Sequence, residues 1–71
     1  MKRRQILSTI AREAQRQGKY WQHQREGANH EIWRCGSIEV PIPRHTEIGN
    51  GMAEMIFKEL EGELGKDWWR R

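Results

Sequence analysis

Residues 18–43 have the sequence GKYWQHQREGANHEIWRCGSIEVPIP, which has the pattern of a three-stranded antiparallel sheet. Short segments enriched in aromatic and β-branched residues are typical of strands, and here they are 20–24, 31–34 and 37–42. The links between them, 26–29 and 34–37, are short enough for hairpins. Each strand is therefore expected to pair with the next one along the chain.

The third of these segments carries two signals of its position in the sheet. Ile38, Val40 and Ile42 occupy alternate positions, so they share one face of a strand. Pro41 and Pro43 have no N–H group to donate, and such prolines are confined to edge strands or strand ends. This segment is predicted to lie at an edge of the sheet.

The segment before the sheet is predicted to be a helix over residues 2–17. Ile6, Ile10 and Ala14 recur at intervals of four and form a one-sided apolar stripe. Gly18 follows the last of them, where a left-handed C-terminal cap is expected. The helix is expected to pack with this apolar stripe against the sheet.

The segment after the sheet is predicted to be a second helix that begins at Gly51, with Asn50 as its N-cap and Gly65 as its stop. Its apolar stripe, widened by Met55, is expected to comprise Met52, Ile56, Leu60 and Leu64. The predicted fold class is α+β in the order αβββα. Both helices are expected on one face of the sheet, with the other face open.

The length of 71 residues suffices for one small core, so we expect a single domain over 1–65 and a tail, 66–71, without periodicity. Cys35 is the only cysteine, which excludes an internal disulfide and a cysteine-based zinc site and fits a reducing cytoplasm. No apolar run approaches the roughly 20 residues that span a bilayer, and the basic start lacks a signal-peptide stretch. We expect a soluble cytoplasmic protein without a membrane partner.

The net charge is +3, and the basic residues are concentrated in the first part of the chain. Glu13 is the one acidic residue among residues 1–25, whose basic residues are Lys2, Arg3, Arg4, Arg12, Arg16, Lys19 and Arg25. Such a distribution is typical of a phosphate-facing surface, and a solvated helix face explains it equally well. On the first interpretation these side chains bind RNA, together with Arg44 in the connector after the sheet.

Three stretches, taken together, resemble the HicA toxin family. They are Gly27-Ala28-Asn29-His30-Glu31-Ile32-Trp33, Val40-Pro41-Ile42-Pro43-Arg44-His45, and the amphipathic helix that Gly51 opens. The resemblance covers residues 6–64 and implies a double-stranded-RNA-binding-domain-like fold, cleavage of mRNA, and silencing by a HicB-type antitoxin. It also implies that His30 is the catalytic residue, because a Glu-Ile-aromatic strand follows it. Asn29 and Ala28 stand where a serine and a glycine are usual.

A histidine suits RNA cleavage, because an unperturbed imidazole, with a pKa of about 6.5, populates both protonation states near neutrality. His30 could take the proton of the 2′-hydroxyl or protonate the leaving 5′-oxygen. Strand alternation places it on one face with Ile32 and Arg34, opposite Glu31 and Trp33, and near the rim of the sheet. A histidine at this place can also merely cap the hairpin by hydrogen bonding.

The remaining aromatic and histidine residues give weaker signals. His45 could help to bind phosphate but is favoured as a loop residue, and His23 as a solvated strand residue. The three histidines lack the spacing of zinc motifs, so neither a metal nor another cofactor is expected. A small domain cannot easily bury both Trp68 and Trp69, so this pair should dock on the domain's own surface or on a partner.

Three functions are consistent with these patterns. The first is a metal-independent endoribonuclease that cleaves mRNA and is neutralised by an antitoxin over the His30 surface. The second is a noncatalytic RNA-binding module, and the third a structural adaptor whose open surface meets a protein. His30 alone favours the first function over the other two.

Overall fold

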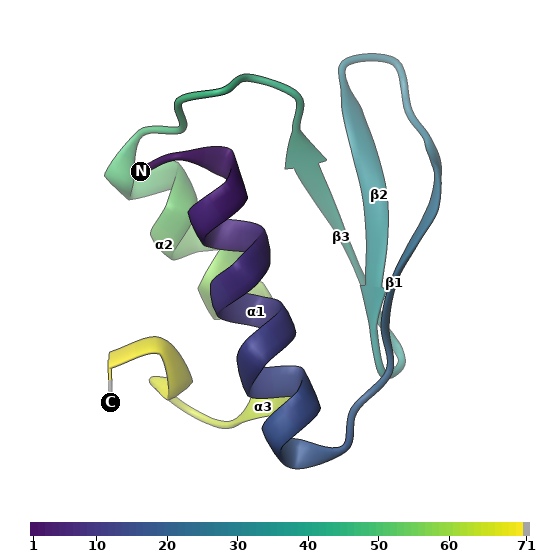
Figure 1. Ribbon diagram of the computed structural model, residues 1–71, viewed down its shortest axis with the longest axis vertical. Helices are drawn as coiled ribbons and strands as arrows, with labels where there is room; N and C mark the ends of the chain where they lie inside the picture. Colours follow the sequence, from purple (N-terminus) through teal and green to yellow (C-terminus); the bar gives the residue numbers. More distant parts are fainter. Residues whose placement is uncertain (71) are drawn as a thin grey trace.

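The computed structural model describes residues 1–70 and has the predicted αβββα order. Its elements are α1 (Arg3–Gln17), β1 (Trp21–Glu26), β2 (His30–Cys35), β3 (Ile38–Pro43), α2 (Asn50–Glu59), α3 (Glu61–Leu64) and a 3₁₀ turn, η1 (Trp68–Arg70). The strands form one antiparallel sheet in the order β1-β2-β3. Figure 1 shows α1 and α2 together on one side of this sheet. The α+β fold class is therefore confirmed.

Helix α1 forms because its apolar side chains recur on one face. Ile6, Ile10 and Ala14 are all buried against the sheet and the other helices, as the stripe predicted. Gly18 ends the helix in the left-handed conformation, with φ of 68°, and its N–H donates to the carbonyl of Gln15. A side chain at this φ is strained, which explains a glycine at this position.

The sheet is slightly longer than its sequence pattern indicates. All three strands end one or two residues later than predicted, β1 and β3 begin one residue later, and β2 begins one residue earlier. His30 is therefore the first residue of β2, and it lies opposite Pro43 in β3. Strand β3 is an edge strand, as its prolines predicted. A bulge between His23 and Arg25 interrupts the pairing of β1 with β2.

The register assigns the two faces of β2. Trp33 lies opposite Val40, which is fully buried, so Trp33 faces the helices, where it also stacks on Trp21 with ring centroids 4.9 Å apart. Ile32, one residue earlier, therefore points to the other face. His30 and Arg34 share that face with Ile32. These three residues therefore share one face, as strand alternation predicted, and that face is the open one.

The second helix differs from its prediction in start, stripe and length. Asn50 is the first helical residue rather than the N-cap, and the backbone breaks at Leu60, so α2 and α3 replace one continuous helix. The predicted inward side chains of Met52 and Met55 are 47% and 58% exposed. Residues four apart drift by about 40° per step around a helix, so a strict four-residue repeat does not stay on one face. Ile56, Leu60 and Leu64 are buried as predicted, and Ala53 and Phe57 take the place of the two methionines.

The C-terminal segment packs on the domain's own surface. Trp68 is buried, and its indole N–H donates to the carbonyl of Phe57 at 2.9 Å. Trp69 is partly buried and stacks on the Phe57 ring, with centroids 5.9 Å apart. Of the two alternatives for this pair, docking on the domain is the one observed.

Within the described residues, none of the helices combines the length and the apolar character that a membrane crossing requires.

Candidate active site

His30 lies at the rim of the open face, where the β1–β2 turn enters β2. The turn is closed by the N–H of Gly27, which donates to the carbonyl of His30 at 2.7 Å. A Cβ atom at position 27 would lie 2.8 Å from that carbonyl oxygen and 3.7 Å from Nε2 of the imidazole. Gly27 is thus needed for the close approach of the turn to His30, and the imidazole is half-buried beside it.

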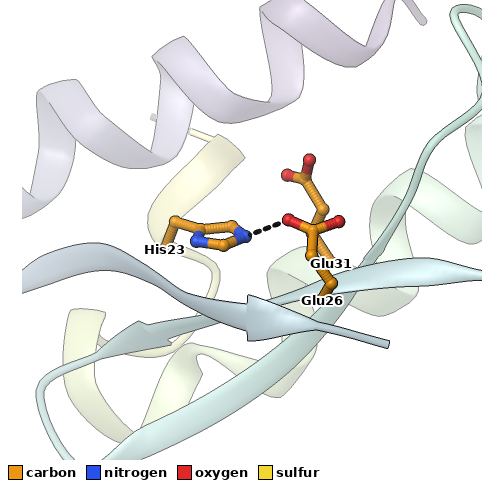
Figure 2. Close-up of side chains that lie close together, drawn as sticks. All are labelled: His23, Glu26 and Glu31. Carbon is orange, nitrogen blue, oxygen red and sulfur yellow. Dashed lines mark hydrogen bonds and ion pairs between the residues drawn. The ribbon is translucent and has the colours of Figure 1, made fainter. Parts of the chain in front are cut away.

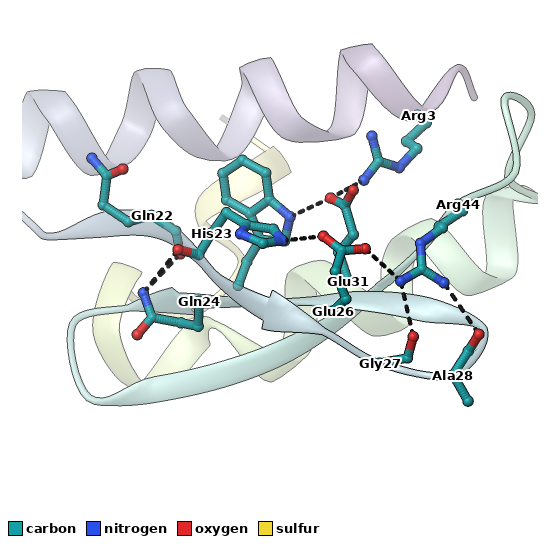
Figure 3. Close-up of polar contacts among 10 residues, drawn as sticks. Arg3, Gln22, His23, Gln24, Glu26, Gly27, Ala28, Glu31 and Arg44 are labelled. Atoms are coloured by element: carbon teal, nitrogen blue, oxygen red, sulfur yellow. Dashed lines mark hydrogen bonds and ion pairs between the residues drawn. The ribbon is translucent and has the colours of Figure 1, made fainter.

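Arg44 holds the turn that carries His30. Its guanidinium donates to the carbonyl of Gly27 at 2.9 Å and to that of Ala28 at 3.2 Å, and it contacts the Glu26 carboxylate at 2.6 Å (Figure 3). These contacts lower the pKa of Glu26, first through Arg44 and second through a hydrogen bond with His23. The predicted RNA-binding residue Arg44 therefore also orders the backbone just before His30.

Arg3 reaches the same end of the sheet from α1. Its Nε donates to the carbonyl of Pro43 at 2.8 Å, and a terminal nitrogen is paired with the carboxylate of Glu31 (Figure 3). The indole N–H of Trp33 also donates to Glu31, at 3.0 Å. This bond and, after it, the pairing with Arg3 lower the pKa of Glu31. Arg3 thus joins α1 to β2, the strand that begins with His30, and to β3, which pairs with it.

Four of the other predicted RNA-binding residues form ion pairs at the surface. The pairs are Lys2 with Glu47, Arg16 with Glu13, Lys19 with Glu63, and Arg25 with Glu39. Exposed pairs of this kind contribute little to stability, so a phosphate can replace the carboxylate at small cost. Arg4 and Arg12 form neither an ion pair nor a side-chain hydrogen bond among residues 1–70.

The predicted RNA-binding residues do not form one continuous patch. Lys2, Arg3, Arg4 and Arg44 border a single hollow of about 380 Å³, with Leu7 and Thr46 completing its wall. Arg12 borders a separate hollow beside Phe57 and Trp69, and Arg25 pairs across the open face with Glu39. Only the first group is connected to the His30 turn, through Arg44 and Arg3.

The open face has a further cationic residue that the charge pattern did not single out. The Arg34 guanidinium lies over the ring of Tyr20, 4.7 Å from its centroid. Tyr20 is 45% exposed, and its hydroxyl accepts a hydrogen bond from Gln24 at 3.0 Å. Strand alternation did place Arg34 on the face of His30. Tyr20 was predicted to begin a strand but lies just before β1, and its contact with Arg34 depends on how the strands pair.

Three possible metal ligands gather on the helix-facing side of the sheet. The ligand atoms of His23, Glu26 and Glu31 lie within 4.8 Å of one another (Figure 2). The bulge in β1 makes this possible, because in a regular strand residues three apart point to opposite faces. Arg44 and Arg3 already balance the two carboxylates, so the group is explained as a network of ion pairs. Histidine spacing alone gave no signal of this cluster.

Comparison of the chain with protein-family models, with curated proteins and with solved structures finds no match. The function is therefore inferred from the residues of the site itself.

Proposed function

We propose that this chain is an endoribonuclease, the toxin of a HicA/HicB-type toxin–antitoxin pair, with His30 as its catalytic residue. The observation that carries the proposal is the position of His30 on the rim of the open face, in a turn that Arg44 fixes by three contacts. A catalytic group needs this kind of fixed placement, because misplacement by about 1 Å can cost about 100-fold in rate. The proposed setting is the cytoplasm, where mRNA is the substrate.

The proposed reaction needs no metal. A base removes the proton of a 2′-hydroxyl, the resulting oxygen attacks the adjacent phosphorus, and the bond to the 5′-oxygen breaks as that oxygen gains a proton. The products are a 2′,3′-cyclic phosphate and a 5′-hydroxyl. His30 performs one of the two proton transfers, and nearby guanidinium groups stabilise the charge on the non-bridging oxygens.

The experiment that tests this proposal is incubation of an mRNA with the purified chain in the presence of a chelator. We expect cleavage and a new 5′-hydroxyl end, detected by labelling with a polynucleotide kinase without prior phosphatase treatment. Cleavage that depends on an added divalent cation, or products with a 5′-phosphate, would contradict the mechanism.

A noncatalytic RNA-binding module is the second candidate, because the open face offers Tyr20 and Arg34 as a stacking platform for a base. One assay that follows both the binding and the length of the RNA distinguishes the two functions. A module binds RNA with equal affinity whether or not His30 is present and leaves the RNA intact, whereas the proposed enzyme shortens it.

A further inference from the structure

The first turn of α1 borders a cationic hollow that the proposed proton transfers do not use. Its wall comprises the side chains of Lys2, Arg3, Arg4, Leu7, Arg44 and Thr46, and its volume is about 380 Å³. The lining has four cationic groups and a hydroxyl, and it contains neither an aromatic ring nor a carboxylate. Such a wall suits a compact anion better than a nucleobase, which would require a stacking partner.

Most of the positive charge around this hollow is already balanced. Glu31 pairs with Arg3, Glu26 with Arg44, and Glu47 with Lys2 at 3.1 Å. Arg4 is exposed and has no acidic partner within residues 1–70. Its charge is therefore available to a ligand without the loss of an existing ion pair.

We propose that this hollow binds one backbone phosphate of RNA, with Arg4 as the residue that supplies the unbalanced charge. The inference rests on the proposed function for the identity of the substrate. Lys2 and the Thr46 hydroxyl border the same space and complete the set of donors. A guanidinium suits this task, because its planar fork can give two parallel hydrogen bonds to phosphate oxygens.

The hollow is connected to His30 by residues that the two places share. Arg44 borders the hollow and donates to Gly27 and Ala28 in the turn before His30, and Arg3 borders it and donates to Pro43, which lies opposite His30. Figure 3 shows both arginines reaching toward this end of the sheet. A strand with one phosphate in the hollow is thereby anchored beside the catalytic turn.

Arg12 provides a matched control for Arg4. Both are exposed arginines on α1 without an ion pair in the described part of the chain, but Arg12 borders the other hollow. Eight helical residues separate them by about 12 Å along the axis, which exceeds the Debye length of about 8 Å at physiological salt. Removal of either charge changes the net charge equally, so only a local contact distinguishes them.

The test measures binding of a labelled single-stranded RNA by fluorescence anisotropy, in a His30→Ala background that prevents cleavage. Arg4→Gln should weaken binding about tenfold, the effect of losing one charge-assisted hydrogen-bonding partner. For Arg4→Gln, the slope of log affinity against the logarithm of the salt concentration should fall in magnitude by about 0.7, the value for one phosphate of a single strand. Arg12→Gln should change affinity less than about threefold, and thermal melting should show all variants folded.

Several results would overturn the proposed phosphate site. Equal losses of RNA affinity in Arg4→Gln and Arg12→Gln would mean that the positive charge attracts RNA without a specific contact. Unchanged affinity of Arg4→Gln, or no RNA binding by the chain at all, would exclude the site. Displacement of the RNA by stoichiometric inorganic phosphate at matched ionic strength would assign the hollow to free phosphate instead. RNA cleavage is measured separately, with Arg4→Gln in a chain that keeps His30. If this variant cleaves RNA as fast as the wild type, the proposed nuclease is retained and the phosphate site is rejected. If the wild-type chain binds RNA through Arg4 but does not cleave it, the phosphate site is retained and the nuclease function is rejected.

Discussion

Gly27 and His30 approach each other so closely that the size of a single methyl group matters. The added Cβ of Gly27→Ala would lie 2.8 Å from a backbone oxygen, which cannot rotate away as a flexible side chain can. The turn must then shift, at a cost of about 1–3 kcal/mol in the free energy of unfolding. We expect the variant to fold and to lose most of its RNA cleavage, because the imidazole moves with the turn.

The matched control for Gly27→Ala is Gly51→Ala. A Cβ at position 51 meets nothing within 4 Å, and Gly51 lies in the first turn of α2. This substitution should leave cleavage unchanged and stabilise the protein by up to about 1 kcal/mol. Urea denaturation and a cleavage assay on both variants provide the measurement. Full activity of Gly27→Ala would show that the turn does not position His30.

Among the elements, the link between α1 and the strands depends on the ion pair of Arg3 with Glu31. In the folded protein the pKa of Glu31 lies below its ordinary value, first because of the hydrogen bond from Trp33 and second because of the pairing with Arg3. The stabilisation from its carboxylate is therefore complete above the unfolded pKa and is lost as pH falls through the lower, folded pKa. The melting temperature of the wild type should exceed that of Glu31→Gln at pH 7. This difference in melting temperature should decrease steadily from pH 5 to pH 3.

Glu59→Gln is the control for this pH dependence. Glu59 is exposed on α2 and has no ion pair among residues 1–70. Its substitution should leave the melting temperature close to that of the wild type over the same range. A difference in melting temperature between wild type and Glu31→Gln that stays constant down to pH 3 would show that the charge of this carboxylate, which Trp33 and Arg3 both contact, does not stabilise the fold.

The elements also show what a sequence can predict. Helix α1 and the strands have local signals, namely an apolar stripe ended by Gly18 and short segments between turn residues, and both predictions are confirmed within two residues. The inward face of α2 was predicted only in part. Ile56 and Leu60 are buried as predicted, but Met52 fits the four-residue repeat and is exposed, whereas Ala53 and Phe57 are buried and do not fit it. Periodicity alone does not distinguish two overlapping stripes on a short helix.

The arrangement around His30 was predictable only in part. Alternation along β2 placed Arg34 on the same face as His30, and the structure agrees. The hydrogen bond from Arg44 to the carbonyl of Gly27 joins residues 17 positions apart. The contact between His23 and Glu26 depends on the bulge in β1. Neither contact has a local signal, because each depends on how the strands pair.

At the scale of the whole molecule, the domain keeps one sheet face and the outer edge of β1 unpaired within the described residues. We expect a HicB-type antitoxin to cover the open face around His30 and to present acidic groups or a strand to this edge. Co-expression should yield a stable complex that does not cleave RNA. The chain should also melt at a higher temperature in the complex, because the partner binds only the folded state. A stable complex that cleaves at the rate of the free chain would contradict occlusion of His30.

Proton transfer by His30 in RNA cleavage is tested by the single-turnover rate constant of His30→Ala, measured with a chelator present. His23→Gln is the matched control, because His23 lies on the helix-facing side of the sheet, opposite Trp33. We predict a loss of about 10²- to 10⁴-fold for His30→Ala, the usual contribution of general acid–base catalysis, and less than about threefold for His23→Gln. Equal rate constants for the wild type and a folded His30→Ala variant would contradict the account.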